Sequence, residues 1–316
     1  MRVAVTGSAG RLGRALVEAL EEAPFTGPLG PTAWDRQAFD LDEPERIPAL
    51  LDRDRPEVVI HAAAWTNVDG CARERELAVS RNGSAVGALA RACADRGIDL
   101  VVVSTNEVFP GTRSDGRGYA PDDPPDPPNA YGRSKLIGEQ AAADAFEHVT
   151  GTRPGPFVPV DRLADGPQLA IVRTAWLYGP PGNDFPDKIV AAATRAEAAG
   201  EPLRVVGDEF GQPTRTADLA EAIVELVGAP RFAGIHHCVN TGVASRADWA
   251  RAVLDALVPG TPVEEVPAAS WRRDSTPPAW GVLEPTPLPS GEPMRPWRQA
   301  LADDLAWRRA ATRAAR

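Results

Sequence analysis

Residues 1–13 read MRVAVTGSAGRLG, with glycines at positions 7, 10 and 13 in the pattern G-x-x-G-x-x-G. An apolar run at residues 2–6 precedes the first glycine, and a helical stretch at residues 12–22 follows the last. Such glycines let the backbone turn tightly and approach a pyrophosphate, while the start of the helix presents free N–H groups and a positive dipole. The stretch therefore predicts a strand–turn–helix unit that binds a dinucleotide, and its flanks disfavour a turn that binds nothing.

Short apolar runs alternate with helical stretches along the first half of the chain. The strand-like runs are residues 56–61 (PEVVIH), 99–104 (DLVVVS) and 169–173 (LAIVR), and the helical stretches are residues 85–96 and 131–146. Continuous apolar strands between helices are typical of a parallel sheet covered on both faces. We expect a doubly wound α/β fold, with residues 1–178 and about 214–243 in the dinucleotide-binding domain. Residues 179–213 and 244–316 would form a smaller domain that binds the substrate.

Composition and charge exclude several classes of partner. The formal net charge of −10 leaves no basic face, so nucleic acid and an anionic membrane surface are disfavoured. Cys71, Cys93 and Cys238 lie far apart and the four histidines show no ligand spacing, which predicts neither a disulfide framework nor a metal site. No secretory signal and no long apolar span is found, so we expect a cytoplasmic protein. A homodimer is possible.

The end of the second strand is expected to select the ribose of the cofactor. Asp35 lies 22 residues beyond Gly13, and Arg36 follows it. A carboxylate here accepts hydrogen bonds from the ribose 2′-OH of NAD, whereas an arginine pairs with the 2′-phosphate of NADP. Because both stand side by side, the sequence leaves NADH and NADPH open. Asp40, with Leu41 beside it, is a further candidate for contact with the adenine.

Tyr131 and Lys135 are spaced i, i+4, which places both side chains on one face of a helix. The ammonium is expected to lower the pKa of the phenol and to bond the cofactor ribose, so that the tyrosine exchanges a proton with a carbonyl oxygen. Ser104 and Thr105 close the preceding strand at its carboxyl end, where open α/β sheets bind ligands. A hydroxyl there would complete a Ser/Thr–Tyr–Lys triad.

These residues resemble the extended short-chain dehydrogenase/reductases and, within them, the dTDP-4-dehydrorhamnose reductase family. The resemblance covers nearly the whole chain. Beyond the glycines and the Tyr–Lys pair, it rests on residues 62–69 (AAAWTNVD), 104–109 (STNEVF), 173–178 (RTAWLY), 208–214 (DEFGQPT) and 295–298 (RPWR).

The resemblance implies reduction of the 4-keto group of a dTDP-4-keto-6-deoxyhexose with NADPH or NADH. It implies the catalytic residues Thr105, Tyr131 and Lys135, and a substrate set of Thr105, Asn106, Glu107, Trp176, Asn183 and Phe185. Together with the glycine loop and the ribose selector, the cofactor set comprises Gly7, Gly10, Arg11, Leu12, Gly13, Asp35, Arg36, Asp40, Leu41, Ala62, Ala63, Ala64, Thr66, Ser104, Tyr131 and Lys135. No metal ligand is implied.

Three departures from the family pattern leave alternatives open. Asn106 and Glu107 stand where the family has Asp-Tyr, Pro277 stands where an arginine is frequent, and residues 151–166 look like an insertion. Thr-Asn-Glu is also close to the Thr-Asp-Glu of nucleotide-sugar 4,6-dehydratases, in which the aspartate acts as acid and the glutamate as base. Asn106 cannot supply that acid proton, so the sequence disfavours a function as a dehydratase or epimerase. A third possibility is a non-catalytic module, because the family also resembles the regulatory subunit of methionine adenosyltransferase.

Overall fold

The computed structural model describes residues 1–153, 155 and 166–314. Its centre is a six-stranded sheet with the strand order β10-β5-β4-β3-β1-β2, in which every pairing is parallel. The strands are β1 (Val3–Thr6), β2 (Thr32–Trp34), β3 (Val58–His61), β4 (Asp99–Thr105), β5 (Leu169–Thr174) and β10 (Gly234–His237). The predicted parallel α/β sheet is confirmed.

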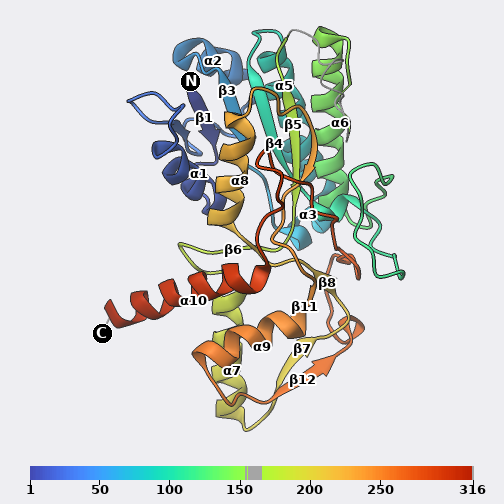
Figure 1. Ribbon diagram of the computed structural model, residues 1–316. Helices are drawn as coiled ribbons and strands as arrows, with labels where there is room; N and C mark the ends of the chain where they lie inside the picture. The colour runs from blue at the N-terminus through green and yellow to red at the C-terminus, as the bar shows by residue number, and fades with distance from the viewer. Residues whose placement is uncertain (154, 156–165, 315–316) are drawn as a thin grey trace.

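Helices cover both faces of the sheet (Figure 1). The helices that pack on it are α1 (Arg11–Glu21), α2 (Ile47–Asp54), α5 (Ala85–Ala94), α6 (Ala130–Thr150) and α8 (Thr216–Gly228). Alternate residues of a strand point to opposite faces. On β4, Val101 therefore joins the core made with α1 and α8, whereas Leu100 and Val102 join the core made with α2, α5 and α6. This is the doubly wound arrangement that the alternating pattern predicts.

The strand order reverses at β1. The chain passes from β1 to β2 on one side, and β3 then lies on the other side of β1. A ligand of an open α/β sheet binds outside the carboxyl ends of the strands at such a reversal. The glycine loop, which begins directly after β1, lies at this point.

A second group of elements lies below the sheet in Figure 1. It comprises α7 (Phe185–Ala199), α9 (Arg246–Leu257), β7 (Leu203–Val206) and β12 (Val263–Val266), with the short pairs β6 (Leu177–Tyr178)–β9 (Thr214–Arg215) and β8 (Phe210–Gly211)–β11 (Ala244–Ser245). The last helix, α10 (Trp297–Ala314), packs on this group through Trp297, Leu301 and Leu305. The division of the chain into two domains at residues 178, 213 and 243 stays a prediction.

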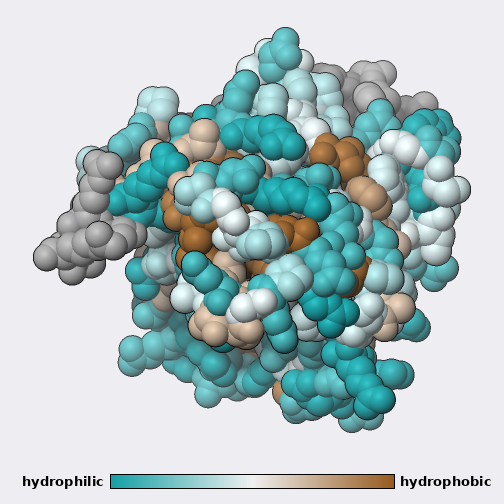
Figure 2. Space-filling view, turned by 90° about the horizontal axis from the view of Figure 1, so that it is seen from below, coloured by the Kyte–Doolittle hydropathy of each residue, from teal (hydrophilic) through white to brown (hydrophobic). Residues whose placement is uncertain are grey.

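The remaining α-helices of the described residues are α3 (Val68–Arg73) and α4 (Arg75–Val79), followed by a π-helical turn, η2 (Ser80–Ser84). Most of the predicted insertion at residues 151–166 lies outside the described residues. In the described part of the chain, no helix is long and apolar enough to cross a membrane. Within the same residues, no group of three His, Cys, Asp or Glu side chains could hold a metal ion. Figure 2 shows hydrophilic side chains over most of the lower face, with hydrophobic ones in separate patches.

Candidate active site

The glycine loop packs so closely on its surroundings that side chains are excluded. A Cβ atom on Gly13 would lie 2.1 Å from the carbonyl oxygen of Gly7, and one on Gly7 would lie 2.9 Å from the backbone of Ala63. Gly7 also has a φ of +66°, which favours glycine. The first amides of α1 follow directly and have no partner within the helix. This loop and helix start form a cradle that fits a pyrophosphate.

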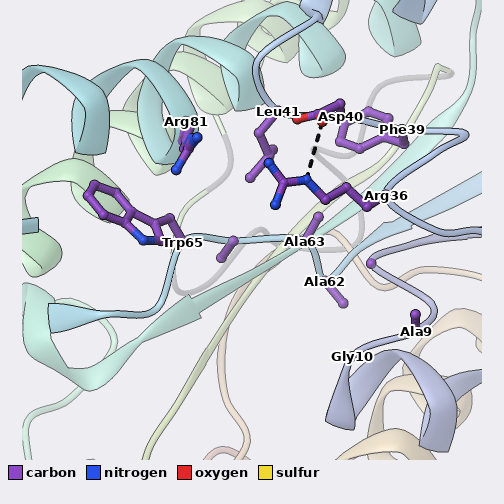
Figure 3. A pocket seen from close by; sticks show the side chains of 12 residues that line it. Ala9, Gly10, Arg36, Phe39, Asp40, Leu41, Ala62, Ala63, Trp65 and Arg81 are labelled. Carbon is purple, nitrogen blue, oxygen red and sulfur yellow. Dashed lines mark hydrogen bonds and ion pairs between the residues drawn. The ribbon is translucent and has the colours of Figure 1, made fainter. Parts of the chain in front are cut away.

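A cavity of about 260 Å³ opens beside the glycine loop (Figure 3). It is lined by Gly7, Ala9, Gly10, Arg36, Phe39, Asp40, Leu41, Ala62, Ala63, Ala64, Trp65 and Arg81. The structure thus brings together eight of the sixteen predicted cofactor residues, from the ends of β1, β2 and β3. We call this cavity the dinucleotide pocket.

The two candidates for ribose selection point to different places. The carboxylate of Asp35 accepts hydrogen bonds from the backbone N–H groups of Gln37 and Ala38 at 2.9 and 3.0 Å, and Asp35 lines a separate hollow. Arg36 lines the dinucleotide pocket, where its Nε lies 3.3 Å from the carboxylate of Asp40 (Figure 3). Of the adjacent pair, only Arg36 borders the pocket.

Three other predicted cofactor residues do not present side chains to this pocket. Leu12 is buried in the core between the sheet and α8. The guanidinium of Arg11 bonds to residues 179–184, and Thr66 is exposed beyond the end of the pocket-lining segment 62–65. Leu12 and Arg11 could therefore contribute only their backbone N–H groups to a bound pyrophosphate.

The dinucleotide pocket also has an aromatic and cationic wall that was not predicted from the sequence. The guanidinium of Arg81 lies 5.3 Å from the ring centroid of Trp65 and forms a bidentate pair with Asp42 at 2.6 and 2.7 Å. Phe39 also lines the pocket, next to Asp40 and Arg36 (Figure 3). The residues come from three separate segments, so no local spacing in the sequence could have revealed them.

The predicted catalytic residues meet at the carboxyl end of β4. Tyr131 lies in the first turn of α6, whose start is capped by the side chain of Asn129 through the N–H of Gly132 at 2.8 Å. The phenol is hydrogen-bonded to Thr105, the last residue of β4. Lys135, one turn further along α6, is buried and donates from Nζ to the carbonyl oxygen of Val103 at 2.7 Å.

The protonation of this site differs from the expectation in one respect. Burial raises the pKa of the Tyr131 phenol, and Glu107 and Cys71 raise it further, against a smaller opposing effect of the hydrogen bond with Thr105. Burial also lowers the pKa of Lys135 to about 8. The expected lowering of the phenol pKa by Lys135 is therefore wrong in the free protein, where burial raises this pKa and Lys135 is not among the groups that shift it. At neutral pH the phenol carries its proton.

A buried ion pair lies beneath the catalytic residues. Arg173 of β5 pairs with Glu139 of α6 at 2.8 Å, and both residues are 3% exposed. The same carboxylate accepts a hydrogen bond from the hydroxyl of Ser104 at 2.5 Å. Ser104 therefore ties β4 to α6 instead of facing the dinucleotide pocket.

The two unusual residues after Thr105 have separate partners. Asn106 is buried and donates from Nδ2 to the carbonyl oxygen of Gly281 at 2.7 Å. The carboxylate of Glu107 accepts a hydrogen bond from Nδ2 of Asn129 at 2.6 Å. Burial raises the pKa of Glu107, and the hydrogen bond from Asn129 opposes that shift. Glu107 thus stands near the Tyr131 phenol, whereas Asn106 is held by the backbone.

Aromatic side chains gather where the substrate residues are predicted. Trp176 is stacked on Trp249 with a centroid distance of 5.8 Å, and Phe185 is stacked on the same ring at 4.2 Å. Trp176 and Phe185 are half-buried. Asn183 is exposed and has a φ of +59°. The structure brings Trp176 and Phe185 into one cluster and leaves the side chain of Asn183 at the surface.

Arg246, which the sequence analysis missed, covers this aromatic cluster. Its guanidinium lies 3.6 Å from the ring centroid of Trp176 and 3.6 Å from the carboxylate of Glu209, which also binds Arg273 at 2.6 Å. Burial lowers the pKa of Arg246 to about 10, and Glu209 and Glu107 oppose that shift. A cationic group therefore lies over the aromatic rings and is close enough to Glu107 to feel its charge.

The chain matches the family model of the RmlD substrate binding domain over residues 1–154 and 161–309. The chain belongs to this family. The match extends over the segments that carry the glycine loop, the Tyr–Lys pair and the aromatic cluster.

Relatives of this RmlD family member carry the names of sugar-nucleotide reductases. The chain is 35% identical to a dTDP-4-dehydrorhamnose reductase of Streptomyces griseus, over 95% of this chain and 92% of the relative. It is 39% identical to a dTDP-4-keto-6-deoxy-D-glucose reductase of Streptomyces niveus, over 80% and 77% of the two chains. The names agree on the reaction class and differ in the sugar.

A solved structure of an RmlD relative has the same fold. It is the dTDP-4-dehydrorhamnose reductase of Bacillus anthracis in complex with NADP, with a TM-score of 0.80 and 28% sequence identity. The match covers 96% of this chain and 98% of that one.

Proposed function

We propose that this protein reduces the 4-keto group of a dTDP-4-keto-6-deoxyhexose to an alcohol with NADPH or NADH. The observation that carries the proposal is the arrangement of Thr105, Tyr131 and Lys135 at the end of β4, beside the strands that form the dinucleotide pocket. The names of the two Streptomyces relatives, both reductases of dTDP-linked keto sugars, support the same reaction class.

The dinucleotide pocket supports the choice of cofactor. The glycine loop and the first amides of α1 would hold the pyrophosphate, and the apolar floor of Ala62, Ala63 and Leu41 would lie against the adenosine. The guanidinium of Arg36 at the rim would donate hydrogen bonds to a 2′-phosphate, which favours binding of NADPH over NADH. A bound reduced nicotinamide supplies the hydride for this reaction.

The residues of the chain supply the proton and the binding energy. Tyr131, whose phenol carries its proton at neutral pH, donates that proton to the carbonyl oxygen, so that hydride and proton together convert the ketone to an alcohol. The Thr105 hydroxyl orients the phenol and the carbonyl. Lys135 lies one turn away on the same helix and stabilises the phenolate that remains until solvent returns the proton.

The sugar would be held by the aromatic cluster and the polar groups around it. Trp176 and Phe185 offer apolar faces to the 6-deoxy sugar, and the Glu107 carboxylate can accept hydrogen bonds from sugar hydroxyls. Arg246, stacked on Trp176, offers N–H donors to the oxygens of the substrate. This set suits a hexose with both apolar and hydroxyl-bearing edges.

The two alternatives find less support. The dehydratase needs an acid at position 106, and the amide of Asn106 is engaged with the carbonyl oxygen of Gly281. A regulatory module has no need of a tyrosine hydrogen-bonded to Thr105 with a lysine one turn away. Three buried, free cysteines are compatible with the reducing cytoplasm, which we propose as the location. The homodimer stays a prediction that light scattering in solution would check.

The decisive experiment supplies purified protein with a set of dTDP-4-keto-6-deoxyhexoses and follows the absorbance of NADPH and NADH. The proposal expects stoichiometric consumption of reduced cofactor with at least one sugar, and loss of that activity in Tyr131→Phe. Conversion of the sugar without net consumption of cofactor would instead establish a dehydratase or epimerase. Binding of cofactor and sugar with no conversion of either would favour the regulatory module.

A further inference from the structure

The side chain of Arg11 leaves the glycine loop and reaches the segment that connects β6 with α7. Its Nη1 donates to the carbonyl oxygens of Gly179 and Gly182 at 2.6 and 2.9 Å, and it pairs with the carboxylate of Asp184 at 3.2 Å. Arg11 lines a hollow that it shares with Pro180 and Pro181, on a different side of the loop from the dinucleotide pocket. One residue of the predicted cofactor loop is thus bound to the segment that precedes the aromatic cluster.

Asp184 is the centre of this contact. It is 5% exposed, and besides Arg11 its Oδ2 accepts hydrogen bonds from the N–H of Gly179 at 2.8 Å and from Arg308 at 2.7 Å. Its Oδ1 caps the start of α7. Since Arg308 belongs to the last helix, one buried carboxylate joins the glycine loop, the 179–184 segment and α10. Charged groups buried in this way hold their partners in a narrow range of positions.

The 179–184 segment requires contacts of this kind. Gly179, Gly182 and Asn183 all have positive φ, at +131°, +95° and +59°. Asn183 is one of the few non-glycine residues with such a backbone, which is uncommon for L-residues and persists where the surroundings impose it. The segment leads directly into Phe185, which is stacked on Trp249. A shift of the segment would therefore move the apolar wall of the sugar site.

We propose that Arg11 is a positioning residue for the sugar site and does not bind the cofactor through its side chain. The guanidinium fixes the 179–184 segment against the glycine loop and, through Asp184, sets the place of Phe185. This inference rests on the proposed function, since it takes the aromatic cluster as the binding site of the sugar. It assigns the loop two duties: its backbone receives the cofactor, and its arginine orders the substrate site.

The test compares Arg11→Ala with Arg14→Ala. Arg14 lies on the same helix, and within the described residues its side chain bonds only to the carbonyl oxygen of Ala9, so it is the matched control for loss of a cation near the loop. Two affinities are measured without turnover. The affinity for NADPH is measured by the fluorescence of the cofactor, and the affinity for dTDP-glucose is measured by calorimetry. The KM of the keto sugar and kcat are measured beside them.

We expect Arg11→Ala to lower the affinity for dTDP-glucose and to raise the KM of the keto sugar, each by about tenfold or more. A small displacement of a binding wall is enough to cause such a loss of affinity. The affinity for NADPH should stay within about twofold of the wild type, and Arg14→Ala should match the wild type in every measurement. Asp184→Asn should reproduce the effect, and adding it to Arg11→Ala should cost less than the sum of the single changes.

Arg11→Lys provides the rescue. All three contacts are made by a single nitrogen of Arg11, and the ammonium of an extended lysine side chain offers three N–H donors to the same three acceptors. We expect Arg11→Lys to recover most of the affinity for dTDP-glucose. Because the lysine restores the contact instead of removing it, this variant also serves if Arg11→Ala does not fold.

The outcomes separate this inference from the proposed function. If Arg11→Ala lowers the affinity for NADPH and leaves the affinity for dTDP-glucose unchanged, the inference is overturned and Arg11 is a cofactor ligand. The inference is also overturned if Arg11→Ala lowers the affinities for NADPH and dTDP-glucose equally and Arg11→Lys recovers neither affinity. If the wild type binds dTDP-glucose and NADPH but reduces no keto sugar, the proposed reaction fails while the two affinities still decide the role of Arg11. A wild type that does not bind dTDP-glucose would overturn both.

Discussion

Removal of the Glu139 carboxylate is expected to destabilise the protein strongly. Glu139 and Arg173 are both 3% exposed, and Arg173 binds the carboxylate through Nε and Nη2 at 3.2 and 2.8 Å. In Glu139→Ala the guanidinium keeps only the carbonyl oxygen of Pro121 at 3.3 Å and the face of Phe109 at 5.0 Å among its contacts in the described structure. Breaking one partner out of a buried pair costs about 3–5 kcal/mol of unfolding free energy.

Urea unfolding followed by tryptophan fluorescence measures that loss. The matched control is Asp144→Ala on the same helix, because Asp144 pairs with Arg153 at 2.6 Å while both side chains are about half exposed. An exposed pair contributes only about 0–1 kcal/mol. The double variant Glu139→Ala with Arg173→Ala removes both charges, so its loss should be smaller than the sum of the two single losses.

The same variant has a second readout in the active site. The charge of Glu139 raises the pKa of Lys135, which burial alone would lower further. Glu139→Ala should therefore move the deprotonation of Lys135 below pH 8, and the pH dependence of kcat/KM should shift in the same direction. A loss of less than about 1 kcal/mol, equal to that of Asp144→Ala, would refute the reasoning, since it would mean that the pair is solvated in solution.

Three further predictions concern the reaction. Tyr131→Phe should lower kcat by about 10² or more with little change in the affinity for NADPH, and near-normal turnover would contradict its role as proton donor. Because Lys135 loses its charge as pH rises through about 8, kcat/KM should fall above that pH. Lys135→Arg, if it is active, should abolish this fall. A flat pH profile in the wild type would contradict the role of the Lys135 charge in the reaction. Arg36→Ala should lower the affinity for NADPH more than the affinity for NADH, whereas Asp35→Ala should leave the ratio of the two affinities unchanged. Equal losses of affinity for NADH and NADPH in Arg36→Ala would place Arg36 away from the 2′ position.

The parts of the fold that the sequence predicted are those with a local signal. The glycine loop, the apolar strands and the Tyr–Lys spacing each lie within one short segment, and the period of the pattern is enough to identify strand or helix. Alternate burial on β4, with Val101 facing α1 and α8 and Leu100 facing the other layer, follows from the same periodicity. These elements already fix where the cofactor must lie.

What the sequence did not predict are contacts between distant segments. Arg246 meets Trp176 across 70 positions of the chain, and Arg81 meets Trp65 across 16, with no spacing that marks either pair. The choice between Asp35 and Arg36 is of another kind. Both have the right residue type at the right place, and only the hydrogen bonds of Asp35 to its own turn decide which side chain faces the pocket.

The electrostatics of the site keep the proton on Tyr131 in the free protein. A group that gives up a proton must hold it at neutral pH, and burial keeps the phenol of Tyr131 in its protonated form. Glu107 works in the same direction, because a carboxylate near the phenol disfavours the phenolate. The exchange of an aromatic residue for glutamate at position 107 therefore does more than offer a hydrogen-bond acceptor to the sugar. It makes Tyr131 a weaker acid in the free protein, so that formation of the phenolate depends more heavily on the charge of Lys135.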